Sequence, residues 1–207
     1  MVLGGVICGK PRTRTYGMGL TLVAAANVEP ITLAECKYHL RIDSDDEDLL
    51  LTIYIVAARE YCEEITRRSL TASTTYKQTL DSFPRGNGWI GIDRGPLVSV
   101  SSIAYVDTNE VIQTLDPDVY RVDTSCLPGR ISPAINGRWP ATADLPSSVA
   151  ITFVAGATNI PIRAKQAMLL LVGHWYRNRE AVGENVGNSI PHGVENLLAA
   201  LHLGTYP

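Results

Sequence analysis

The sequence lacks an excess of positive charge. Its 207 residues include 18 Lys and Arg against 21 Asp and Glu, which gives a formal net charge of −3 at pH 7. Proteins that hold nucleic acid through its phosphate backbone need a basic surface. The charge balance therefore argues against a chain whose main activity is DNA binding, and any contact with DNA is expected to be local or repulsive.

Paired cysteines and long apolar runs are also missing. Cys8, Cys36, Cys62 and Cys126 are widely separated and form neither a CxxC pair nor a Cys/His zinc spacing, so we interpret them as reduced thiols. The segment "MGLTLVAAA" faintly imitates a secretory signal, but its apolar run is short. No run reaches membrane-spanning length, so we expect a soluble protein without a membrane partner.

Catalytic and metal-binding motifs are absent as well. The sequence has no GxSxG pentapeptide, no Walker loop, no GxGxxG and no HExxH. Its acidic group at 45–48 suits the N-terminus of a helix, and it lacks the alternating ligands and central glycine of a calcium loop. We therefore expect no catalytic residues, no metal and no cofactor.

The residues that are present predict helices at both ends of the chain. Thr32 and Glu35 have the spacing of a capping box, which predicts a short helix over about 33–40. A second, long helix is predicted over about 45–68, with acidic residues in its first turn and arginines in its last. One apolar stripe at helical spacing is expected to face the core: Leu50, Ile53, Tyr54, Ala57, Tyr61 and Ile65.

Between these helical segments the apolar period changes to two. β-rich runs such as "TTYKQTL", "LVSVSSIAYVD" and "VAITFVAG" alternate with Gly, Pro and Asp, which predicts an antiparallel sheet. The apolar parity switches across Ser101 and Ser102, which predicts a bulge or a bend. Helical periodicity returns over about 162–180, expected to be the most buried helix, and over about 193–203.

The predicted fold is therefore α+β, a helical core with an inserted antiparallel β lobe. Residues 29–72 and 156–207 are expected to form the helical core, and residues 73–155 the β-rich insertion. Residues 1–28 are expected to form an N-terminal extension.

The stretch "HWYRNREAV" at 174–182 ends the predicted central helix and allows two interpretations. Aromatic and arginine side chains together can bind nucleic acid. However, Trp175 continues the apolar stripe of Ala164, Met168 and Leu171, and arginines suit the last turn of a helix. We favour a buried helix that emerges into solvent, with a contact surface as the second interpretation.

The order of the segments resembles a known family. "EPITLAECKYHLRID", "DEDLLLTIYIVAAREYCEEITRRSL", "GPLVSVSSIAYVD", "VAGATNIPIRAKQAMLLLVGHWYRNREAV" and "IPHGVENLLAAL" are together similar to head-tail connector (adaptor) proteins of tailed bacteriophages. The nearest group is the gp6-like and phiE125 gp8-like adaptors, which also include those of gene transfer agents. The resemblance covers about residues 28–203, and it leaves residues 1–17 as an extension.

The resemblance implies a structural virion protein without catalytic residues. Such proteins form a ring, expected to be twelvefold, under the portal protein, and extend the channel through which DNA passes without sequence recognition. A downstream tail, stopper or tail-terminator protein would bind the other side. The expected location is the head-tail interface of the virion, with the bacterial host cytoplasm as the site of assembly.

Nine residues are candidates for contacts with other subunits or with the portal. They come from the charged face of the second helix and from the end of the central helix onward: Arg59, Glu63, Arg67, His174, Tyr176, Arg177, Arg179, Glu180 and His192. Two alternative classes stay open. A DNA-binding module of a phage or prophage would need a basic face, and a small hydrolase would need a pocket with convergent polar groups.

The missing motifs generate a first prediction. Purified protein should contain no stoichiometric metal and should catalyse no reaction, because the sequence offers neither a nucleophile-base pair nor a cluster of ligands. Elemental analysis is the measurement. Zinc, iron or calcium bound in a fixed ratio, and lost on changing one or two residues, would contradict it.

Overall fold

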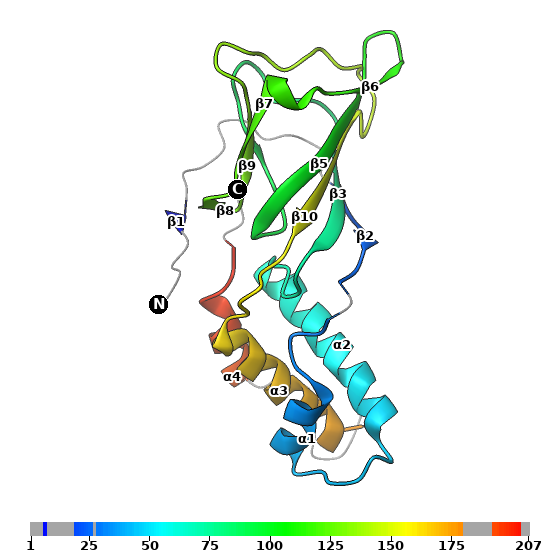
Figure 1. The fold of residues 1–207 in the computed structure, drawn as a ribbon, viewed down its shortest axis with the longest axis vertical. Helices are drawn as coiled ribbons and strands as arrows, with labels where there is room; N and C mark the ends of the chain where they lie inside the picture. Colours follow the sequence, from blue (N-terminus) through cyan, green and yellow to red (C-terminus); the bar gives the residue numbers. More distant parts are fainter. Residues whose placement is uncertain (1–5, 8–18, 27, 180–191, 204–207) are drawn as a thin grey trace. The chain divides into compact units, whose positions relative to one another are not determined.

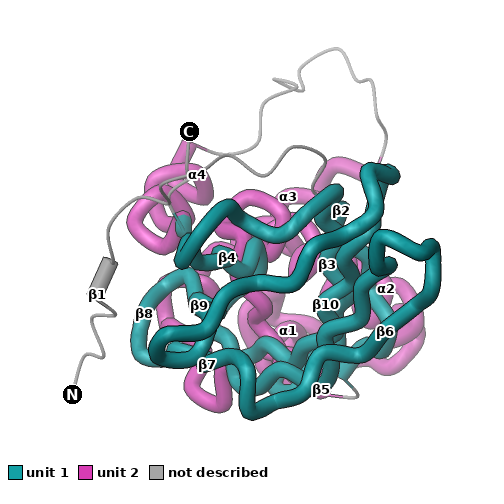
Figure 2. Tube along the Cα trace, turned by 90° about the horizontal axis from the view of Figure 1, so that it is seen from above, with its two compact units in different colours: residues 1–26, 72–156, 203–207 teal, residues 27–71, 157–202 magenta. Residues whose placement is uncertain are grey.

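A computed structural model describes residues 6–7, 19–26, 28–179 and 192–203 (Figure 1). It contains both helices and mostly antiparallel sheets, so the predicted α+β class is confirmed. The chain divides into two compact units (Figure 2). The sheet unit comprises residues 1–26, 72–156 and 203–207, and the helical unit comprises residues 27–71 and 157–202.

The sheet unit is built around one five-stranded antiparallel sheet. Its strands, in spatial order, are β2 (Gly19–Ala24), β3 (Thr74–Leu80), β10 (Val149–Ala155), β5 (Leu97–Val106) and β6 (Ile112–Thr114). A second sheet has the order β4 (Ile90–Gly91), β9 (Arg130–Pro133) and β7 (Tyr120–Asp123), and a 3-10 turn, η1 (Pro117–Val119), precedes β7. The short strands β1 (Val6–Ile7) and β8 (Cys126–Leu127) pair in parallel.

Side chains from both larger sheets share one apolar core. Alternate residues of β3 and β10 are buried, as expected of strands with one face on a core. Tyr76 stacks on Phe153 with 5.8 Å between ring centroids, and Ile131 of the second sheet joins the same cluster. In the pairing of β10 with β5 the partner shifts from Ser102 to Val100, so Ser101 is the extra residue and the predicted bulge is confirmed.

The helical unit consists of α1 (Leu33–Leu40), α2 (Asp48–Thr66), α3 (Ile162–Arg177) and α4 (His192–Ala199). The predicted capping box is present at α1, where Thr32 accepts a hydrogen bond from the backbone of Glu35 and the Glu35 carboxylate accepts one from the backbone of Thr32. The four helices bury one common core, with α3 contributing Ala164, Ala167, Met168, Leu171 and Val172.

The predicted buried stripe of α2 is wrong in part, because Tyr54 and Tyr61 do pack against the helical core but two other members do not. Ile53 and Ile65, assigned to the core, are 56% and 39% exposed. The buried side is shifted by about one residue and carries Leu51, Ile55, Ala58, Cys62, Glu63 and Thr66. Apolar residues occupy most of the circumference of the first turns of α2, so periodicity alone fits several stripes. Packing against α1, α3 and α4 selects among them.

Several boundaries also differ from the prediction. Arg67 has a left-handed backbone conformation, with φ of 53°, and α2 ends before it. Helix α3 ends at Arg177 and α4 at Ala199, both earlier than expected. Trp175 is partly buried at the margin of the helical core, 6.3 Å from the ring of Tyr54, instead of fully inside it. Residues 19–24, expected in the extension, form the edge strand β2.

The shifted stripe places a carboxylate inside the helical unit. Glu63 is 7% exposed, although the pattern assigned it to the wet face. One of its oxygens accepts a hydrogen bond of 2.6 Å from the backbone N–H of Leu70, and the other accepts one of 2.9 Å from Arg59. Arg59 also donates to Glu29 at 2.9 Å. Glu63 therefore joins the end of α2 to the chain that follows it.

The buried carboxylate generates a stability prediction. Glu63→Ala should lower the free energy of unfolding of the helical unit by about 2–4 kcal/mol, because it leaves the buried N–H of Leu70 without its acceptor and removes one of the carboxylates that bind the half-buried Arg59. Glu63→Gln keeps an oxygen for Leu70 and should cost less. The matched control is Glu60→Ala, which removes only an exposed contact of 3.4 Å with the same guanidinium. Urea unfolding followed by circular dichroism is the measurement. Equal effects of Glu63→Ala and Glu60→Ala would contradict the assignment.

Candidate functional site

The end of α3 is held by one carboxylate at the start of α2. Glu47 accepts a hydrogen bond from the Tyr176 hydroxyl and, through its other oxygen, one of 2.5 Å from the guanidinium of Arg179. The same guanidinium lies 4.7 Å from the centre of the Tyr176 ring. Two of the candidate contact residues are therefore engaged within their own chain.

The hydrogen bonds of this cluster shift the pKa values of Glu47 and Tyr176. The hydrogen bond from the Tyr176 hydroxyl, followed by that from Arg179, lowers the pKa of Glu47, and the bond to Glu47 raises the pKa of Tyr176. Glu47 was not identified from the sequence. It lies 129 residues from Tyr176, and only the packing of α3 brings the two side chains together.

A pocket of about 690 Å³ lies between the C-terminal ends of α1 and α3. Its lining is basic and contains no carboxylate: His39, Leu40, Arg41, Leu170, Gly173, His174, Arg177 and Asn178. Asn178 closes α3 by donating from its backbone and its side chain to the carbonyl of His174. Within the described parts of the chain, the exposed side chain of Arg177 forms no hydrogen bond or ion pair.

The remaining candidate residues do not form one surface with this pocket. Arg59 and Glu63 bond to each other, and Arg67 is partly buried at the end of α2. His192 is exposed at the start of α4, with its ring nitrogen 3.5 Å from the carboxylate of Glu195. Glu180 lies outside the described residues. The structure thus brings Tyr176 and Arg179 together, because both bind Glu47. It also brings His174 and Arg177 together, because both line the pocket.

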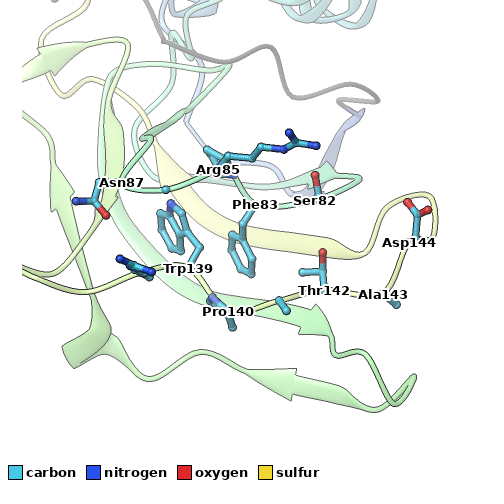
Figure 3. Close-up of a pocket in the computed structure, with 13 residues that line it drawn as sticks. Ser82, Phe83, Arg85, Asn87, Trp139, Pro140, Thr142, Ala143 and Asp144 are labelled. Carbon is cyan, nitrogen blue, oxygen red and sulfur yellow. The ribbon is translucent and has the colours of Figure 1, made fainter.

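The sheet unit contains a second pocket of about 740 Å³, lined by residues 82–87 and 138–144 (Figure 3). The rings of Phe83 and Trp139 stack there with centroids 4.8 Å apart, and the indole N–H of Trp139 donates to the carbonyl of Gly88. The hydroxyls of Ser82 and Thr142 have no histidine beside them in this lining. The lining therefore holds no Ser–His pair of the kind that serine hydrolases use.

Over residues 6–7, 19–26, 28–179 and 192–203, no three His, Cys, Asp or Glu side chains are grouped so that they could hold a metal ion. None of the helices described there is long and apolar enough to cross a membrane.

Comparison with known proteins finds similarity to one family over part of the chain. Residues 30–111, which include α1, α2, β3, β4 and β5, match the phage gp6-like head-tail connector protein family. Among curated proteins, none matches significantly.

Three solved structures have the same fold. A protein from the neck of an empty gene transfer agent particle, computed with C6 symmetry, is 24% identical, with a TM-score of 0.70 over 91% of this chain and 100% of its own. One from the neck of the native particle, computed with C12 symmetry, is 23% identical, with a TM-score of 0.69 over 91% of this chain and 100% of its own. One from the native virion has the same identity and TM-score, over 91% and 99%.

The family match and the shared fold agree on one class of protein. Over residues 30–111 the chain is similar to gp6-like head-tail connector proteins. Over 91% of its length it has the fold of proteins from gene transfer agent necks. The alternative of a DNA-binding module finds no support in these comparisons.

The cluster around Glu47 generates a pH prediction. Because folding lowers the pKa of Glu47 below its ordinary value of 4.5, the cluster stabilises the fold above that value, and this contribution is lost as the pH falls through the folded pKa. Tyr176→Phe should move the pKa of Glu47 back toward the ordinary value. NMR titration of the Glu47 side chain is the measurement, with the exposed Tyr38→Phe as control. An unchanged pKa in Tyr176→Phe would contradict the hydrogen bond.

Proposed function

We propose that copies of this chain form a ring beneath the portal protein of a phage or phage-like particle and extend the channel for DNA toward the tail. The observation that carries the proposal is the family match over residues 30–111, supported by the fold shared with gene transfer agent neck proteins over 91% of the chain. Those neck structures were computed with C6 and C12 symmetry, which favours a twelvefold ring here.

The proposed neighbours are the portal on one side of the ring and a tail, stopper or tail-terminator protein on the other. DNA would pass through the ring without sequence recognition. The net charge of −3 agrees with this role, because a strongly basic lumen would hold DNA by its phosphates. The ring would assemble in the host cytoplasm and remain at the head-tail interface of the virion.

The two units suggest a division of this role. The helical unit would be the connector core, with residues 29–72 and 156–207, and residues 73–155 would be its β-rich insertion. Residues 1–28 would be an extension whose last part pairs as β2 with the sheet. The basic pocket with His174 and Arg177 is the candidate contact that remains available, since Arg59, Glu63, Tyr176 and Arg179 are bonded within the chain.

Weak contacts suffice for such a ring if a template holds the copies. Exposed ion pairs contribute only about 0–1 kcal/mol each, so we expect the isolated protein to be monomeric or weakly associated. A portal that presents symmetric sites raises the effective concentration of neighbouring copies, and the many small contributions then act together.

A charge reversal tests the contact. Arg177→Glu should leave the fold intact, because this side chain is exposed, but co-sedimentation with portal particles of the virus or agent that encodes the chain should fall roughly tenfold or more. The matched control is Arg163→Glu, also exposed but at the other end of α3. Reversal of Arg179 is a poorer test because it also breaks the ion pair with Glu47.

Two results would count against the proposal. If Arg177→Glu binds portal particles and completes infectious particles like the unaltered chain, the pocket is not a contact. If the unaltered chain itself does not bind portal particles, the ring beneath the portal is wrong.

A further inference from the structure

The five-stranded sheet ends in β2 at one edge and β6 at the other, and no further strand among the described residues pairs with either. Every residue of β2 except Leu20 is exposed, and so are all three residues of β6. An edge strand presents backbone N–H and C=O groups that can pair with a further strand. The sheet can therefore grow at either side.

Neither edge has the charges that usually prevent such pairing. Charged residues and prolines are absent from both "GLTLVA" and "IQT". Large apolar side chains are exposed there instead: Leu22 at 54%, Val23 at 56% and Ile112 at 75%. The register shift between Leu22 and Ala24 disturbs only the end of β2, so most of that edge stays regular.

The order of the strands fixes how the two edges can meet. Each of the four neighbouring pairs is antiparallel, so β2 and β6 run in the same direction. A two-fold dimer would join like edges in antiparallel fashion. In a ring of many copies the next copy is turned by a small angle, so unlike edges meet and their strands run parallel.

We propose that β6 of one copy pairs in parallel with β2 of the next copy, so that the sheets form a continuous band around the ring. The inference rests on the proposed function for the existence of the ring, and it adds which surfaces join the copies. A heterologous contact joins two different surfaces, and the two edges of this sheet are different. Both edges also lack charged residues, which allows a further strand to pair with them.

The hydrogen-bond pattern of β6 shows which of its groups are available. Leu115 donates to the carbonyl of Ile103, and Asp107 donates to the carbonyl of Val111. Hydrogen-bonded pairs alternate along an antiparallel ladder, so Gln113 bonds to its partner Tyr105, and the backbone groups of Ile112 and Thr114 point away from β5. These outward groups would bond to β2 of the next copy.

The side chains of the two edges also match by face. Leu22 pairs with Tyr76, and Gln113 pairs with Tyr105, and both tyrosines lie on the core side of the sheet. Thr21 pairs with the exposed Lys77, and Ile112 with Val106, on the opposite side. In the joined sheet, Thr21 of one copy would share a face with Ile112 of the next.

Cysteine crosslinking on assembled particles tests the pairing. Thr21→Cys and Ile112→Cys are combined in a chain with Cys8→Ser, because the other three native cysteines are buried. After binding to portal particles and oxidation, the double variant should give a ladder of crosslinked chains longer than two. Either cysteine alone should give no crosslink, whereas a two-fold contact between like edges would give dimers.

A second pair of variants tests the backbone bonds. Ile112→Pro removes an outward N–H without removing a bond to β5, and Ile112→Thr keeps that N–H while losing the same apolar side chain. Only the proline variant should lose co-sedimentation with portal particles. The edge pairing would be overturned if these two variants bound portal particles equally, or if double-cysteine chains bound to portal particles gave no crosslinked ladder. Neither result would contradict the ring beneath the portal. Failure of the unaltered chain to bind portal particles would instead overturn the proposed function.

Discussion

Burial of α3 against α2 is the interaction on which the helical unit depends. The two helices are far apart in the sequence, and the whole sheet unit is encoded between them. Leu51 and Ile55 of α2 share one core with Met168 and Leu171 of α3. Because a helix as short as α1 or α4 is marginal by itself, these two also need that shared core. The helical unit therefore cannot form until the chain has been synthesised beyond the sheet.

Most charges near this core stabilise the chain's own fold. Glu63 bonds to the backbone of Leu70 and to Arg59, Lys37 pairs with Asp45 and Asp48, and Glu47 binds the end of α3. A chain with balanced charge that uses its ion pairs internally leaves few for its neighbours. Assembly must then rely on repeated weak contacts and on backbone hydrogen bonds. Salt weakens these hydrogen bonds less than it weakens exposed ion pairs.

Local signals in the sequence predicted local features well. The spacing of Thr32 and Glu35 predicted a capping box, and the parity switch at Ser101 predicted a bulge, because each depends on neighbouring residues alone. The similarity to gp6-like connectors was also visible, because the order of helical and β-rich segments can be read from the sequence, and the family model matches residues 30–111.

Features set by distant residues could not be predicted in the same way. Ile53 and Leu51 are equally apolar, and only the position of the other helices decides that Leu51 is buried. The hydroxyl of Tyr176 finds Glu47 across 129 residues, a pairing without any signal in either segment. The pocket beside Arg177 depends on two helix ends that meet only in the folded unit.

The number of strands in the large sheet sets how the edges of neighbouring copies would meet. With five strands the two edges share a direction, so unlike edges of copies in one orientation run parallel, and gain or loss of a hairpin would keep that relation because it adds or removes two strands. Gain or loss of a single strand would set the edges in opposite directions, and copies in the same orientation would then meet along an antiparallel seam. Because parallel and antiparallel ladders place their hydrogen bonds differently, such a change would require new pairing at every seam of the ring at once.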